Sequence, residues 1–293
     1  MDQAHPHTHQ QTHQHVHPEH DDSDGLAEIL DLDAEVLAEH TASITAWLPL
    51  QDDPRQIVDL GCGTGAGTFA LLDRFPEAYV TAVDASAGHL RRLRAKACAR
   101  GRLEERVRTV QADLDDTAWP DLGTPDLVWA SASLHHLAHP ERALGAVREL
   151  LAPGGVFAVV ELAGFPRFLP EDAPEGRPGL EERCHAVVEH LQRDHMPHRG
   201  ADWGPMLTAA GFTVEGRRTL PVNIEPTGTR TDAVGPYALA GLRRIRGAVA
   251  AALSPEDLTA LDHLLDTTGP HSILRRDDLL VRTERTVWAA RRT

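Results

Sequence analysis

Between residues 56 and 162, short apolar runs alternate with longer stretches in which apolar residues recur every three or four positions. Short runs of β-branched and aliphatic residues favour buried strands, and the longer periodic stretches favour helices. We expect strands at 57–60, 79–84, 107–112, 126–130 and 156–162. We expect helices between them at 69–75, 87–100 and 140–151. This alternation predicts an α/β core over 55–165, with a parallel sheet covered by helices on both faces.

The segment before this core has a helical pattern. Leu37, Thr41, Ile44 and Leu48 recur at a spacing of three or four residues, which places them on one face of a helix. We therefore expect residues 25–54 to form an N-terminal helical lid.

Beyond Gly164 the regular alternation stops, and two insertions are expected. The first, 166–200, begins as a loop rich in proline and charge and continues as a helix. The chain returns to the core at 201–225 with a helix and a strand. The second insertion, 226–277, holds two helices, one of which opens with the capping sequence Ser-Pro-Glu-Asp. A last core strand is expected within 278–293.

The first 24 residues are polar, low in complexity and rich in histidine. They offer little apolar surface to bury, so we expect residues 1–24 to form a disordered tail. These histidines could bind a transition metal loosely. However, neither their spacing nor the nearby carboxylates fix a coordination geometry, and we predict no defined metal site.

The charge and the cysteine content of the chain limit the kinds of molecule that it can bind. Acidic residues outnumber basic ones, and the formal net charge is −15, so the protein's field repels nucleic acid and anionic lipid. Cys62, Cys98 and Cys184 show no paired spacing, which argues against a disulfide framework or a zinc site. No apolar run approaches the roughly 20 residues that span a bilayer, and no secretory signal pattern opens the chain. We expect a cytoplasmic protein whose partners are neither nucleic acid nor membrane.

The strongest local signal is VDLGCGTG at 58–65, where a buried strand runs into a glycine-rich turn before a helix. Glycines allow positive φ and let a ligand approach the backbone closely. The helix N-terminus adds unpaired N–H groups. Taken alone the pattern is weak, because Gly61, Gly63 and Ala66 also satisfy the dinucleotide-binding pattern G-x-G-x-x-G/A.

Three aspartates strengthen this signal. Asp59 precedes the first glycine, Asp84 closes the second expected strand and Asp113 follows the third. The carboxyl ends of such strands line one crevice at the switch point of a parallel sheet. There Asp84 can bond ribose hydroxyls, and Asp113 can accept a hydrogen bond from an adenine amino group. Each could be a turn or capping residue, but all three together indicate a nucleotide-like ligand.

These features resemble the class I S-adenosylmethionine-dependent methyltransferases, above all the ubiquinone/menaquinone-biosynthesis-type branch that acts on small molecules. The matching stretches are VDLGCGTG, TAVDAS, QADL, PDLVWASASLHHL and LAPGGVFAVVEL, followed by LTAAGFTVEG. The resemblance implies S-adenosyl-L-methionine as cofactor. It also implies a Rossmann-like, seven-stranded, mostly parallel sheet, closed by an antiparallel C-terminal hairpin that 212–224 and 280–291 can supply.

The resemblance further implies a set of cofactor-binding residues along the crevice. They are Asp59, Gly61, Cys62, Gly63 and Gly65 near the methionine part, Asp84 with Ala85 at the ribose, Asp113 with Leu114 at the adenine, and Ala130 and Ser131 bordering the methyl group. A nicotinamide dehydrogenase shares the glycine turn but does not usually have such a hairpin.

Catalytic residues are harder to assign. The methyl group of a sulfonium is already electrophilic, so the protein must chiefly align a nucleophile and exclude water. A base is needed only if the acceptor must lose a proton. His135, His136 and Glu161 lie near the ends of the fourth and fifth expected strands and are the candidates. Each has a plainer interpretation: packing or capping for the histidines, and pairing with a buried partner for Glu161.

Further candidates lie in the insertions. Four histidines between 185 and 198 could supply a base or anchor a substrate, although a solvated helix face explains them more simply. Arg243, Arg244 and Arg246 likewise fit a solvated helix face, and could also hold an acidic substrate.

We expect a methyltransferase that transfers a methyl group to an O or N atom of a small-molecule acceptor, such as a secondary metabolite. Methylation of an electron-rich aromatic carbon is an alternative within this class, and it would need an enclosed apolar pocket. A cofactor-binding module without transferase activity and a nicotinamide oxidoreductase are the alternatives from other classes. The acceptor and the oligomeric state, a homodimer included, stay open.

Overall fold

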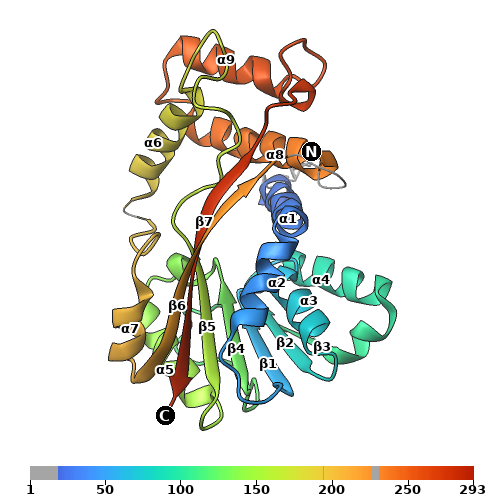
Figure 1. Cartoon of the computed structure of the whole chain (residues 1–293), viewed down its shortest axis with the longest axis vertical. Helices are drawn as coiled ribbons and strands as arrows, with labels where there is room; N and C mark the ends of the chain where they lie inside the picture. Colours follow the sequence, from blue (N-terminus) through green and yellow to red (C-terminus); the bar gives the residue numbers. More distant parts are fainter. Residues whose placement is uncertain (1–18, 194, 226–230) are drawn as a thin grey trace, which may run out of the picture.

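The computed structural model describes residues 19–193, 195–225 and 231–293 (Figure 1). Its centre is a seven-stranded sheet with the order β3-β2-β1-β4-β5-β7-β6. The strands are β1 (Gln56–Leu60), β2 (Tyr79–Asp84), β3 (Val107–Gln111), β4 (Leu127–Ser131), β5 (Val156–Leu162), β6 (Phe212–Ile224) and β7 (Val281–Arg292). Neighbours from β3 to β5 pair in parallel, and β7 is antiparallel to β5 and β6. The predicted Rossmann-like sheet with an antiparallel C-terminal pair is confirmed.

Both faces of this sheet are buried. Along β5, Phe157 and Val159 enter the apolar core on one face, while Ala158 and Val160 enter the core on the other. A parallel sheet needs helices on both faces for this reason. The helices that contribute to these two cores are α2 (Ala38–Trp47), α3 (Ala66–Arg74), α5 (Pro140–Leu150) and α7 (Trp203–Ala209). A further helix, α4 (Ala87–Ala99), packs beside β2 and β3.

A helical cap lies beyond the carboxyl ends of the parallel strands (Figure 1). It consists of α1 (Glu19–Val36), α6 (Leu180–Gln192), α8 (Thr231–Val249) and α9 (Pro255–Leu265). The cap has its own apolar core, in which Cys184, Val234 and Leu242 are fully buried. The far ends of β6 and β7 reach into this core through Ile224 and Val281. The long β6–β7 pair therefore joins the cap to the sheet.

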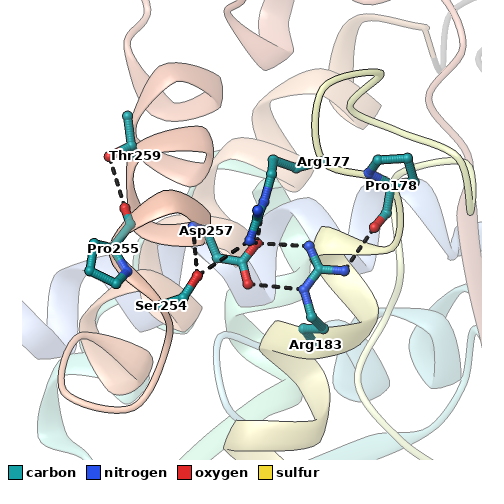
Figure 2. Close-up of polar contacts among 7 residues, drawn as sticks. All are labelled: Arg177, Pro178, Arg183, Ser254, Pro255, Asp257 and Thr259. Atoms are coloured by element: carbon teal, nitrogen blue, oxygen red, sulfur yellow. Dashed lines mark hydrogen bonds and ion pairs between the residues drawn. The ribbon is translucent and has the colours of Figure 1, made fainter.

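One carboxylate ties three segments of the cap together (Figure 2). Asp257, in the first turn of α9, has a side chain only 5% exposed. It accepts hydrogen bonds from Nε and NH2 of Arg177 (2.8 and 2.6 Å) and of Arg183 (2.9 and 2.7 Å). Ser254 caps the same helix, because its Oγ accepts from the backbone N–H of Asp257. The bonds from Arg183 come first among the contacts that lower the pKa of Asp257 to about 2.

The N-terminal segment differs from the expectation. Residues 1–24 were expected to be disordered, but α1 begins at Glu19, and residues 1–18 lie outside the described residues. The later part of this helix is held by packing of Val36 in the cap. Residues 226–230 of the second predicted insertion also lie outside the described residues.

None of the described helices is long and apolar enough to cross a membrane. In the same part of the chain, no group of three or more His, Cys, Asp or Glu side chains is placed to hold a metal ion. Cys62, Cys98 and Cys184 are free thiols.

Candidate functional site

The glycine turn lies between β1 and α3, where the strand order reverses. Gly61, Gly63 and Gly65 have φ values of 65°, 52° and 99°, a region that glycine enters without steric cost. A Cβ atom at Gly61 would lie 2.4 Å from Cβ of Ser133. Ser133 Oγ in turn donates to the backbone oxygen of Leu60 at 3.0 Å. The turn is therefore packed directly against the segment that follows β4.

The carboxylate of Asp84, at the end of β2, holds this turn from the side. Its Oδ2 accepts from the N–H of Gly63 at 2.8 Å, and its Oδ1 accepts from the N–H of Ser86 at 2.8 Å. The Nδ1 of His89 lies 3.2 Å from the same Oδ1. Burial alone would raise the pKa of Asp84, but the bonds from His89, Ser86 and Gly63 outweigh it and lower the pKa. Asp84 is thus an ionised acceptor at the rim of the turn.

Asp59, which was expected beside the polar head of a ligand, lies instead beneath the turn. It is 1% exposed and accepts a hydrogen bond from Oγ1 of Thr68 in α3 at 2.6 Å. Burial raises the pKa of Asp59 to about 7, against the opposing hydrogen bond from Thr68. Its carboxylate therefore braces α3 from below and does not reach the surface of the crevice.

The end of β3 places Asp113 two residues past the last paired residue, Gln111, which stands opposite Asp84. Asp113 is exposed, and its Oδ1 accepts from the N–H of Asp115 at 2.9 Å in a local turn. The Nε2 of Gln111 donates to the backbone oxygen of Ala85 at 3.0 Å. Asp84 and Asp113, the residues expected at the ribose and the adenine, thus lie at the ends of the adjacent strands β2 and β3, and the side chain of Gln111 joins the two ends through its bond to Ala85.

At the end of β4 the backbone is strained. Ala132, directly after Ser131, has φ of 52°, which is uncommon for a residue with a Cβ atom and tends to occur at functional sites. Its N–H donates to the backbone oxygen of Val160 at 2.8 Å, which helps to hold this conformation. The strained residue directs the following residues 133–136 across the top of the sheet, and nothing in the sequence signals it.

Glu161, at the end of β5, is 2% exposed and fixes that segment. Its Oε1 accepts from the N–H groups of Leu134 (2.9 Å) and His135 (3.3 Å), and its Oε2 lies 2.5 Å from Nδ1 of His135. Both oxygens are therefore engaged within the protein, and the ring of His135 is buried with them.

His136 is exposed at the crevice, with its ring centroid 4.2 Å from that of His135. Partial burial of the ring lowers the pKa of His136, and the charges of His135, Arg199 and Arg244 lower it further. The charge of Glu161 raises it. Together they lower the pKa of His136 to about 4. His136 is consequently neutral at physiological pH and a weak base.

Helix α1 covers the glycine turn, and this was not foreseen. Asp31 accepts from Oγ1 of Thr64 (2.6 Å), from Nε of Arg92 (2.5 Å) and from Nζ of Lys96. A Cβ atom at Gly63 would lie 3.2 Å from Cδ1 of Leu30. The sequence predicted a helical lid over 25–54 from residues 37–48, which largely form α2, and it did not indicate which elements α1 would meet.

We expect Asp31→Asn to lower the free energy of unfolding by roughly 1 kcal/mol, because its ion pairs are partly exposed. The melting temperature should fall by about 2–4 °C. Thermal unfolding followed by circular dichroism measures the shift. The matched control is Glu28→Gln, which removes the same charge from an exposed position of α1; equal shifts in the two variants would contradict the assignment.

The central part of the chain is similar in sequence to known proteins. A family profile described as a methyltransferase domain matches residues 58–157. Trans-aconitate 2-methyltransferase of Acidovorax sp. (strain JS42) is 44% identical over 106 residues, which cover 36% of this chain and 38% of that protein. The chain therefore spans well under half the length of this curated relative.

Two solved structures share the fold. A chain from Bacillus halodurans C-125, described as a methyltransferase, has a TM-score of 0.52 at 18% identity and covers 86% of this chain and 98% of that one. The [4+2]-cyclase SpnF has a TM-score of 0.50 at 20% identity and covers 86% of this chain and 79% of that one.

Proposed function

We propose that the chain transfers a methyl group from S-adenosyl-L-methionine to a small-molecule acceptor, since residues 58–157 match a methyltransferase domain profile. One observation carries this proposal: the positive-φ glycine turn, the ionised Asp84 and the strained end of β4 meet at the carboxyl ends of adjacent strands. This is the switch point at which α/β sheets bind their ligands.

The residues around the turn fit an adenosyl sulfonium. The backbone of the turn can approach the methionine part because no Cβ atom stands in the way. Asp84 offers ionised acceptor oxygens to ribose hydroxyls, although Gly63 and His89 already share them. The remaining contacts that we propose come from Cys62 in the turn, Ala85 at the ribose, Asp113 with Leu114 at the adenine, and Ala130 with Ser131 at the methyl group. When bound, the cofactor supplies an electrophilic methyl group.

The protein's own contribution is to position the acceptor and exclude water. We assign Glu161 and His135 to positioning, because they bond each other and the backbone after β4. The cap helices α1, α6, α8 and α9 cover the acceptor in this proposal, whereas α2, the second helix of the predicted lid 25–54, packs against the sheet. An O or N acceptor suits the polar surface at His136 better than an electron-rich aromatic carbon, which would need an apolar enclosure.

Calorimetry with S-adenosylhomocysteine tests this function. We expect Asp84→Ala to weaken binding by about 10- to 30-fold, because it removes a charged acceptor and loosens the turn. Asp116→Ala, an exposed acid near the same crevice, should bind within about twofold of the parent. Melting curves of both variants show whether they are folded. Equal affinity of Asp84→Ala and the parent would refute the site, and stabilisation of the parent by NAD alone would indicate an oxidoreductase.

A further inference from the structure

A guanidinium group of the cap lies near the end of β4 without an acidic partner. Arg199, in the loop between α6 and α7, places its guanidinium carbon 4.0 Å from the ring centroid of Phe165, which follows β5. Its NH1 donates to Oε1 of Gln192 at 2.8 Å, and its NH2 lies 3.0 Å from Sδ of Met196. Its Nε is buried without a hydrogen-bond partner. The groups in close contact with this cation are therefore neutral within the described residues, and the charges of Glu161 and Glu189 act on it only from beyond ion-pair distance.

Several other half-buried arginines of this fold meet a carboxylate, whereas Arg106, Arg148 and Arg292 bond only backbone oxygens within the described residues. Arg177 and Arg183 share Asp257, and Arg285 bonds both oxygens of Asp33 at 2.8 and 2.9 Å. The chain has 44 acidic residues and 29 lysines and arginines, so acidic partners are plentiful. A desolvated cation without a close carboxylate is costly. Arg199 has no carboxylate at ion-pair distance within the described residues and lies beside Phe165 at the end of β5, so it can receive a counter-ion that a ligand brings.

A second cation points to the same place. Arg244, on α8, is exposed and has no ion pair within the described ranges, whereas Arg246 on the same helix pairs with Asp262 at 2.7 Å. The charge of Arg244 acts on both His136 and Arg199. The cap therefore presents two positive charges to the neutral ring of His136 in a protein whose net charge is −15.

We propose that the acceptor is a small organic carboxylic acid, held through a carboxylate by Arg199 and Arg244 beside His136. This proposal rests on the proposed methyltransferase function. The planar guanidinium group matches a carboxylate in a bidentate arrangement. With a di- or tricarboxylate, one carboxylate is held while another is free to react.

A carboxylate acceptor also explains why no strong base stands at this site. Its oxygen carries no proton, so the new O–CH3 bond forms while the S–CH3 bond breaks and its electron pair stays on sulfur. The products are a methyl ester and a neutral thioether, and no proton moves. His136, with a pKa of about 4, and Glu161, with both oxygens engaged, are then not needed as bases.

Binding to the full chain saturated with S-adenosylhomocysteine is the first test, with trans-aconitate as the carboxylate probe and its trimethyl ester as the uncharged control. We expect the acid to bind at least about tenfold more tightly than the ester. Arg199→Gln and Arg244→Gln should each weaken binding of the acid about 5- to 10-fold. Arg243→Gln, which removes the same charge from the adjacent exposed position, should change it less than about twofold.

The ring of His136 gives a second readout that does not depend on turnover. Its pKa, measured by NMR and assigned by its loss in His136→Gln, should rise in an Arg199→Gln, Arg244→Gln double variant, although burial of the ring and the charge of His135 still hold it below its ordinary value. Arg243→Gln should leave that pKa unchanged. An unchanged pKa in the double variant would show that the two arginines do not face His136, and it would overturn the proposed carboxylate site.

The outcomes are distinguishable. If S-adenosylhomocysteine does not bind the parent chain, the proposed function fails. If it binds but acid and ester bind alike, or Arg199→Gln binds the acid as the parent does, only the carboxylate proposal is overturned. Pyrophosphate binding with the same arginine dependence, in the absence of carboxylate binding, would also overturn it in favour of a phosphorylated acceptor.

Discussion

Replacing Glu161 with alanine should lower the free energy of unfolding by roughly 3–5 kcal/mol, because three buried donors would lose their acceptor and each unsatisfied donor costs about 1–3 kcal/mol. The carboxylate is 2% exposed and receives the N–H groups of Leu134 and His135 as well as Nδ1 of His135. Alanine would leave these donors buried without an acceptor, which costs more than the lost attraction alone. Urea unfolding followed by circular dichroism measures the change.

Glu161→Gln is the matched control for this prediction. It keeps one oxygen that can accept from the backbone N–H groups, so we expect a smaller loss of about 1–2 kcal/mol. If the alanine variant loses no more than the glutamine variant, the backbone contacts of Glu161 contribute little to stability. The positioning role given to Glu161 would then have to be abandoned.

Asp257→Ala should lower the free energy of unfolding by about 3 kcal/mol, because two arginines would lose their shared carboxylate (Figure 2). The two guanidinium groups are 37% and 41% exposed and can regain water, which keeps the loss at the lower end of the range for buried pairs. The variant separates α9 from α6 and from the loop that carries Arg177. Chemical unfolding should show the loss, and proteolysis should begin within the cap.

Asp262→Ala serves as the matched control on the same helix. Asp262 also receives a bidentate arginine, Arg246, but its side chain is 54% exposed, so we expect a loss below about 1 kcal/mol. Equal losses of stability in Asp257→Ala and Asp262→Ala would show that burial of the Asp257 carboxylate does not increase its contribution to stability.

The contribution of Asp257 should also depend on pH. Its pKa is lowered to about 2 in the folded chain and is about 3.9 in an unfolded chain. An acid with a lowered pKa stabilises the fold fully above its unfolded value, so the contribution is complete above pH about 4 and is lost as the pH falls toward 2. The difference in stability between the parent and Asp257→Ala should shrink across this window and stay constant above it.

Helix α1 links the two halves of the proposed site. On one side Asp31 bonds Thr64 of the glycine turn. Two residues further along, on nearly the opposite side of the helix, Asp33 accepts from the hydroxyl of Tyr237 in α8 at 2.5 Å and from Arg285 in β7. Helix α1 is therefore bonded both to the glycine turn and to α8 and β7.

Local sequence determined most of the core. The strand at 156–162 and the helix that starts at Pro140 appear where the periodicity predicted them, because strand and helix patterns arise from residues that are close in sequence. The turn at Gly61, Gly63 and Gly65 was also readable, since positive φ and a close approach both require glycine.

Only the tertiary structure decided which side chains meet. Asp59 and Asp84 look alike at their strand ends, yet one is buried against Thr68 and the other holds the rim of the turn. Arg199 and Arg244 come from separate insertions and act together on His136. Such contacts depend on how distant elements pack, and a periodic pattern carries no information about the partner that its face will meet.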